Sequence, residues 1–304
     1  MTRSHKTLLN MLCGLLVLSS MPAMSQDLQL AGFSFTRFPR AEVKDSPLRQ
    51  KVEVNEYNFF FNLPRTLKND KTILISGFQY RLVTPLTDND LNLGLDGQNL
   101  HLIGYRLTVL HPLQNDWKVL VSLNPTLSST FNTVPEGDDF LFNGTLQFVK
   151  KKSDHFSYGG GIAYVSTFGE PGFIPALQFT YSSGNSKLQV LLPRRITYDR
   201  YFGKFTAGLE ISASGSRYNV NYVRTNFFND NEPVDKLAYT RIVFGPSFSY
   251  RVGGVIQLEA SGGITAGRSV ELQSDLFDDE KYDITNGPFF RFGIALVPPE
   301  KNNN

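Results

Sequence analysis

The sequence is poor in cysteine and histidine and has no long apolar run after its first residues. The only cysteine is Cys13, and the chain has four histidines. Cys13 follows Leu12 rather than the small residue that a lipoprotein anchor requires, and it lies in the leading segment described next. The rest of the chain therefore has no thiol for a disulfide, a nucleophile or a thiolate metal site. No later stretch approaches the roughly 18 apolar residues of a membrane-spanning helix.

The first 25 residues have the pattern of an export signal. Two basic residues precede the apolar run Leu8–Leu18, which is too short to cross a bilayer. Ala23-Met24-Ser25 then provides small residues at the two key positions of a cleavage site. We therefore expect residues 1–25 to be a cleaved signal peptide and residues 26–304 to form a single domain.

The mature chain also lacks an excess of either charge. The whole sequence has 30 Lys and Arg and 28 Asp and Glu, and the signal segment contains two basic and no acidic residues. The mature chain is therefore neutral. A nucleic-acid partner would require a clustered basic surface, so none is expected.

What the sequence does contain is alternation with a period of two. Between residues 57 and 82, apolar side chains alternate with polar or small ones in two successive segments, first Tyr57–Leu63 and then Leu74–Leu82. This spacing predicts β-strands with one apolar face. Segments of this kind recur almost to the C-terminus, separated by turn residues, as in transmembrane β-barrels. The 25 Phe, 13 Tyr and 25 Gly suit such a barrel. A soluble exported β-sandwich is a less favoured alternative fold.

The connections between the expected strands alternate between short and long. Outer-membrane barrels place short turns in the periplasm and long loops outside the cell. We predict an all-β fold, an antiparallel up-and-down transmembrane β-barrel of about 12–14 strands in the outer membrane. Within 187–226 we expect strands at 187–197, 204–214 and 216–226. The count falls to twelve if Ser214-Gly215-Ser216 is a bulge and 28–38 is no barrel strand. Gly253-Gly254 is the clearest hairpin turn, with two residues.

Separating each strand by parity gives an apolar face, assigned to lipid, and a polar face, assigned to the lumen. A charge at the bilayer midplane costs about 2–4 kcal/mol for Arg or Lys, so charged residues must face inward. We expect these side chains either to form ion pairs that fill the lumen or to line a narrow pore. The predicted lumen charges are Arg81, Arg106, Glu210, Arg241, Glu259 and Arg291.

The chain resembles an uncharacterised family of bacterial outer-membrane β-barrel proteins. The resemblance rests on the strand Tyr57–Pro64, on Gly77-Phe78-Gln79-Tyr80, on Leu191-Leu192-Pro193 and on the segment Pro288–Leu296. It implies an outer-membrane location and carries no catalytic motif. It also implies two partners, the lipid bilayer and the outer-membrane assembly machinery. Many such barrels end in an aromatic residue, whereas a polar tail ends this chain.

No cluster in the sequence points to catalysis, to a cofactor or to a metal. There is no G-x-S-x-G motif and no histidine-containing metal signature. Asp88-Asn89-Asp90 lacks the closing glutamate of a calcium loop, and Gly159-Gly160-Gly161 indicates a bend or a crowded lumen position. We expect an integral outer-membrane protein that is structural or forms a narrow or plugged pore. The alternative is a rim-active, lipid-modifying enzyme resembling an acyl hydrolase. The sequence does not determine the oligomeric state.

Overall fold

The computed structural model describes residues 28–44, 46, 49–68, 71–88, 93–166, 171–225 and 230–299, so the expected signal peptide lies outside the described residues. These residues form fifteen strands and one short 3-10 helix, η2 (Gly137–Asp139). The strands are β1 (Ala31–Glu42), β2 (Lys51–Thr66), β3 (Ile73–Thr87), β4 (Leu100–Pro112), β5 (Trp117–Ser129), β6 (Phe140–Lys151), β7 (Phe156–Val165), β8 (Gly172–Ser183), β9 (Ser186–Leu192), β10 (Arg195–Phe202), β11 (Phe205–Thr225), β12 (Asn231–Val252), β13 (Ile256–Gln273), β14 (Glu280–Ile284) and β15 (Pro288–Leu296).

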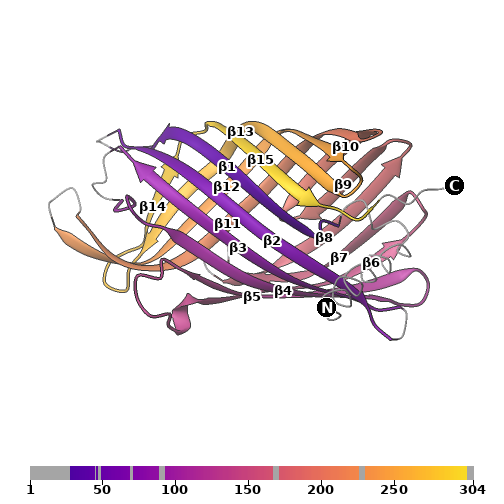
Figure 1. Cartoon of the computed structure of the whole chain (residues 1–304). Coiled ribbons are helices and arrows are strands. Elements are labelled where there is room, and N and C mark those ends of the chain that lie inside the picture. Colours follow the sequence, from indigo (N-terminus) through magenta and orange to yellow (C-terminus); the bar gives the residue numbers. More distant parts are fainter. Residues whose placement is uncertain are drawn as a thin grey trace, which may run out of the picture.

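Fourteen of these strands close into an antiparallel ring (Figure 1). Each strand pairs with the next from β1 to β13, and β15 pairs with both β13 and β1. The short β14 pairs with β13 and forms a bridge from Ile284 to Val43, just after β1. The predicted barrel is therefore confirmed, at the upper limit of the predicted strand count. Within the described part of the chain, no helix has the length and apolar character needed to cross a membrane.

The outward face of the ring is a band of exposed apolar side chains. On β15, for example, Phe290, Phe292 and Ile294 are each 45–60% exposed, whereas Phe289 on the opposite parity is 3% exposed. The faces that parity predicts are therefore the faces of the structure. A soluble monomer rarely exposes so large a continuous apolar surface, whereas a transmembrane barrel presents it to lipid.

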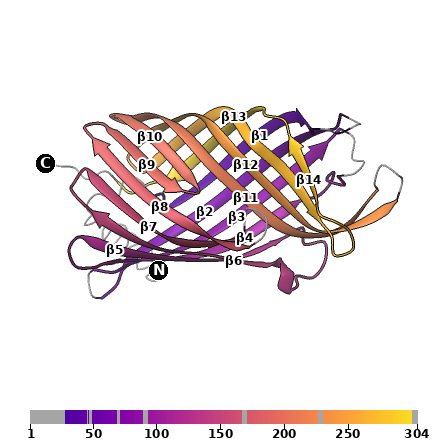
Figure 2. The same cartoon turned by 180° about the vertical axis from the view of Figure 1, so that it is seen from behind.

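The prediction for residues 187–226 is wrong in its details. Ser214–Ser216 is not a turn, because these residues lie within the long strand β11. The expected strand 187–197 is instead a hairpin, in which β9 ends at Leu192 and β10 begins at Arg195. Pro193 and Arg194 form its turn. The two errors cancel in the strand count. Figure 2 shows β9 and β10 as short strands beside β11 and β12.

Two smaller features also refine the predictions. The turn between β12 and β13 contains three residues rather than two, because Val252 pairs with Ile256. Gly253 and Gly254 both have positive φ, as their place in this turn requires. At Gly161, where the sequence indicates a bend or a crowded position, an added Cβ would collide with the backbone oxygen of Leu146 on the neighbouring strand β6.

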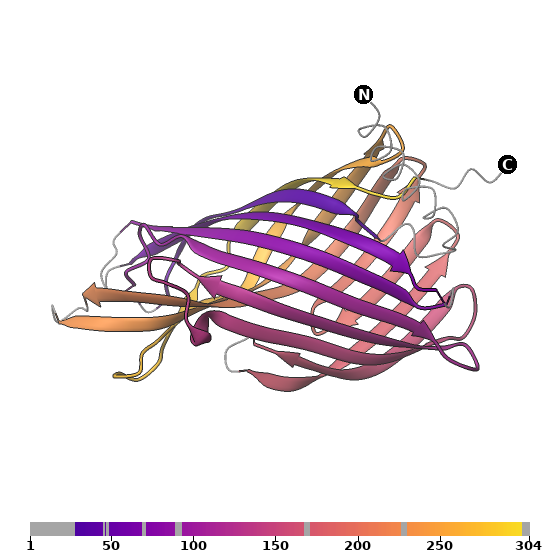
Figure 3. The ribbon, with the colours of Figure 1, turned by 60° about the horizontal axis from the view of Figure 1, so that its bottom comes forward.

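The two ends of the barrel differ in how far the strands extend. At the short-turn end, connections such as 184–185 and 203–204 contain two residues. At the long-loop end, β11 and β12 reach well beyond the apolar band, and β14 occupies part of the expected loop 271–286. Figure 3 shows the β11–β12 and β13–β14 hairpins projecting at this end. The predicted loops are therefore shorter than expected, because their flanking residues continue the strand pairing.

Candidate functional site

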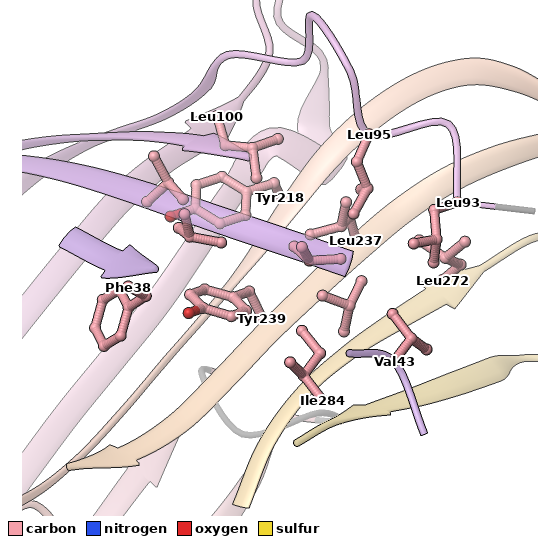
Figure 4. Packing of buried hydrophobic residues seen from close by; sticks show 14 of the residues in the cluster. Phe38, Val43, Leu93, Leu95, Leu100, Tyr218, Leu237, Tyr239, Leu272 and Ile284 are labelled. Atoms are coloured by element: carbon pink, nitrogen blue, oxygen red, sulfur yellow. The ribbon is translucent and has the colours of Figure 1, made fainter. Parts of the chain in front are cut away.

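The lumen at the long-loop end is filled by buried apolar side chains, which we call the apolar plug (Figure 4). They come from strands on opposite sides of the ring and from the connection between β3 and β4. Leu93 and Leu95 of that connection are 0% and 1% exposed. The plug consists of Phe38, Ala41, Val43, Val52, Val54, Val83, Leu93, Leu95, Leu100, Leu102, Tyr218, Val220, Val234, Leu237, Tyr239, Val243, Val270, Leu272, Ile284 and Phe289.

Two buried arginines lie against the plug. Arg241 forms an ion pair with Glu56, and both side chains are 7% exposed. Its guanidinium lies 5.2 Å from the ring centroid of Phe38 and 5.1 Å from that of Tyr239. Arg268 contacts the same two rings and donates from Nε to the Tyr239 hydroxyl at 3.2 Å. For Arg241, the carboxylate and the two aromatic faces offset the cost of removing the cation from water. For Arg268, the two rings, the Tyr239 hydroxyl and the Val52 carbonyl do so.

Below the plug, toward the short-turn end, the lumen is polar, and we call this part the vestibule. Glu210 lies here, with Oε1 3.5 Å from Arg195 Nε and Oε2 3.6 Å from Arg291 Nη1. Arg291 also donates to Thr36 Oγ1 at 3.3 Å. Glu259 accepts from Gln29 Nε2 at 2.5 Å and from Gln257 Nε2 at 2.7 Å.

Two further predicted residues, Arg81 and Arg106, bind neutral partners. Arg81 donates to Ser216 Oγ at 3.2 Å, which links β3 across the lumen to β11. Arg106 donates from Nε to Asn124 Oδ1 at 3.1 Å. Among the six predicted lumen charges, only Glu210 and Arg291 form an ion pair with each other. Arg241 pairs instead with a residue outside the predicted set, and Glu259 makes hydrogen bonds.

Sequence reasoning missed Arg194 and Arg195. Arg194 lies in the β9–β10 turn, within electrostatic reach of Arg106, Arg81 and Arg195. We call Arg81, Arg106, Arg194, Arg195 and Arg291 the arginine cluster. Among the described residues, Arg81, Arg106 and Arg194 have no carboxylate partner within ion-pair distance. The Leu192-Pro193-Arg194-Arg195 run carried only a weak signal. Proline has no N–H to donate to a strand pair, but Pro125 and Pro246 nevertheless lie within paired strands of this barrel.

The barrel wall is interrupted above the β9–β10 hairpin. The last pair between β8 and β9 is Leu177 with Leu192, and the first between β10 and β11 is Arg195 with Ser212. Beyond this level, residues 172–176 of β8 have no strand partner on that side among the residues that the structure describes. The upper part of β11 contacts the end of β5 instead. There Asn219 pairs with Ser129, and the backbone N–H of Thr130 donates to the Asn219 carbonyl at 3.1 Å. We call this interruption the wall break.

A separate polar cluster stabilises the projecting hairpins at the long-loop end. Arg224 binds Glu232 at 2.6 Å and Glu280 at 2.9 Å, and its own side chain is 5% exposed. The hydrogen bond from Arg224 lowers the pKa of Glu280. Burial and then the hydrogen bond with Glu280 raise the pKa of Tyr282 to about 12. Burial alone would lower the pKa of Arg224, but its bonds with Glu280 and Tyr282 raise it instead.

The remaining candidates from the sequence are dispersed. His101 Nδ1 lies 2.8 Å from the Tyr80 hydroxyl, beside Phe131. Asp96 accepts from the Thr87 backbone N–H at 2.6 Å, whereas residues 89 and 90 lie outside the described part of the chain. The described residues contain no group of three or more His, Cys, Asp or Glu side chains placed to hold a metal ion.

Comparison with known proteins gives a family and no activity. The model of the family described as "Domain of unknown function (DUF6268)" matches residues 36–296. No curated protein matches the chain. Solved structures with some similarity include the β-domain of the Bordetella autotransporter BrkA, with 10% identity and a TM-score of 0.30, covering 89% of this chain and 100% of that one.

Two further structures are similar at the same level. The translocator domain of the autotransporter NalP from Neisseria meningitidis has 10% identity and a TM-score of 0.27, with 97% of this chain and 96% of that one covered. A mutant porin from Rh. blastica has 10% identity and a TM-score of 0.28, with coverage of 87% and 100%. Scores this low support no argument, and the barrel is established by its own strand pairing.

Proposed function

Since the chain belongs to the DUF6268 family of domains of unknown function, we propose from its geometry that it is an integral outer-membrane barrel with a plugged lumen. The observation that carries this proposal is the apolar plug, which occupies the lumen at the long-loop end. An open pore needs a continuous hydrated path, and buried apolar side chains exclude water from such a path. In this proposal the vestibule opens toward the short-turn end only.

We propose that the short-turn end faces the periplasm and the long-loop end faces outward. The pattern of short turns and long loops supports this orientation, because it is the usual one in outer-membrane barrels. Export by the predicted signal peptide and insertion by the assembly machinery belong to the same proposal. Fractionation tests it: the mature protein should remain with outer membranes and require detergent for extraction, and a monodisperse soluble protein would contradict it.

The plug itself is tested by conductance in a planar bilayer. The unmodified protein should show no steady conductance. Replacing Leu93 and Leu95 together by serine should loosen the plug and produce brief openings, because both side chains are fully buried in it. Val134→Ser is the matched control, since Val134 is 82% exposed. A large steady conductance in the unmodified barrel would contradict the plug and favour a pore.

We propose no catalytic role. Supporting this, His101 is engaged with Tyr80 and Phe131 rather than with a nucleophile and an orienting carboxylate. Incubation of the purified barrel with phospholipid, followed by measurement of released fatty acid, tests this part of the proposal. Release above the level of a boiled sample would support the alternative of a lipid-modifying enzyme.

A further inference from the structure

The arginine cluster carries more positive charge than its surroundings neutralise. Its five guanidinium groups share one ion-paired carboxylate, that of Glu210, and the carboxylate of Asp199 lies within electrostatic reach of Arg195, so among the described residues five cations face two anions. Arg81 and Arg106 repel one another, and Arg194 lies near both. A concave site with walls of low dielectric constant concentrates such a field. A structural ion-pair cluster would have matched charges, whereas this one has the composition of an anion-binding site.

The guanidinium groups are available to a ligand. Arg194 and Arg195 are exposed residues, and Arg81, Arg106 and Arg291 are half-buried. Guanidinium forks match phosphate oxygens in geometry and bind them through paired, charge-assisted hydrogen bonds. Among the described residues the Arg194 side chain forms no hydrogen bond or ion pair, although Glu210 lies within its electrostatic reach, so an anion would not have to displace a bound partner.

The wall break gives this cluster a route to the bilayer. On one side lies the free edge of β8, where the outward residue Phe173 is 71% exposed. On the other side, Ala213 of β11 pairs with Ile242, which belongs to the exposed apolar band. The break therefore lies at the level of lipid, where an unpaired strand edge is costly. Arg194 forms its lower border, since the Ala213 N–H donates to the Arg194 carbonyl at 2.9 Å.

We propose that the arginine cluster binds the phosphate of an anionic phospholipid that reaches it sideways through the wall break. The acyl chains remain in the bilayer beside Phe173, and the headgroup oxygens face the arginines and the free edge of β8. This inference rests on the proposed function, since it places the site in a vestibule closed to the outside.

The test is a lipid titration of the delipidated full-length barrel in a neutral detergent, followed by native mass spectrometry. The probes are phosphatidylglycerol, zwitterionic phosphatidylcholine and inorganic phosphate. The unmodified barrel should bind one phosphatidylglycerol in preference to phosphatidylcholine. Arg194→Gln and Arg106→Gln should each weaken this binding roughly tenfold, as expected for the loss of a charged hydrogen bond.

Arg200→Gln is the matched control and should leave binding unchanged. Arg200 lies on β10 close to the site in sequence, but its guanidinium packs 5.4 Å from the ring centroid of Phe202. Unheated and heated gel migration shows whether each variant is folded. Arg194→Lys separates shape from charge, because lysine keeps the charge and loses the fork, and it should bind less tightly than the unmodified protein.

The route is tested with phosphatidylglycerol that carries a photoreactive group on an acyl chain. Labelling should fall on β8 and β11 beside the wall break, near Phe173 and Ala213. Equal binding by the unmodified protein and the Arg194 and Arg106 variants would overturn the proposal, as would labelling spread evenly around the barrel. Binding of inorganic phosphate without preference for phosphatidylglycerol would indicate a free-anion site and also overturn it. Conductance of the same preparation reports separately on the plug.

Discussion

The two ends of this barrel fill a wide lumen in different ways. At the long-loop end, apolar side chains and aromatic-stacked arginines pack as in a soluble protein, whereas the vestibule holds charged groups that are partly open to water. The strands at the long-loop end extend past the apolar band, where no lipid covers their outer face. Stability there must come from burial inside the barrel. At the level of the apolar band, lipid covers the outer face and the inside can remain polar.

The largest effect should come from Phe38→Ala, a truncation in the plug. Phe38 is fully buried and contacts Phe289, Arg241 and Arg268. Loss of its ring should cost about 3–5 kcal/mol in the free energy of unfolding, measured by urea unfolding in lipid vesicles. Phe60→Ala is the control, since Phe60 is half-buried in the vestibule. An equal loss of unfolding free energy in both variants would contradict the view that internal packing stabilises the long-loop end more than the vestibule.

Breaking the buried ion pair should have a similar or slightly smaller effect. Glu56→Ala leaves the Arg241 guanidinium without its carboxylate in the plug and should lower the free energy of unfolding by about 3–5 kcal/mol. The two aromatic rings against Arg241 reduce this loss. Glu210→Ala in the vestibule should cost less, because water can solvate Arg195, whose side chain is 49% exposed. If Glu210→Ala proves the more damaging change, the vestibule is drier than the geometry indicates.

Charge on the lipid face should be less tolerated than charge in the vestibule. Phe292 is 60% exposed to lipid, and Phe292→Arg should cost about 2–4 kcal/mol near mid-depth. Gln257→Arg, placed inside the vestibule near Glu259, is the comparison and should be nearly neutral. The yield of heat-modifiable barrel after refolding measures both. Similar yields would mean that the assigned faces are wrong.

The smallest effect should be a local dependence on pH in the projecting hairpins. The bond with Arg224 lowers the pKa of Glu280 in the folded state below its ordinary 4.5. This contribution to stability is fully present above the ordinary pKa and is lost as pH falls through the folded-state value. The protection of the β14 amides against hydrogen exchange, corrected for the intrinsic exchange rate at each pH, should therefore fall below about pH 4.5. Glu280→Gln should remove that pH dependence, and its persistence in the variant would exclude Glu280 as the cause.

The periodicity of the sequence predicted most of the wall, because along the apolar band each strand of the ring presents alternate side chains to lipid. The outward faces of β4, β12 and β15 follow directly from parity. The errors arose where strands are not limited by the bilayer. β11 continues through Ser214–Ser216 because its upper half pairs with β12 and meets β5, and these contacts are distant in sequence.

The sequence by itself therefore determined the fold class, the two faces and the separation of short turns from long loops, since each depends on local spacing and composition. Only the tertiary structure decided how the lumen is occupied. Glu56 and Arg241 lie 185 residues apart, and Glu210 on β11 meets Arg291 on β15, with β12 and β13 between them in the ring. Parity showed that such side chains point inward. Their depth and their partners depend on the registers of many strands together, which no local pattern encodes.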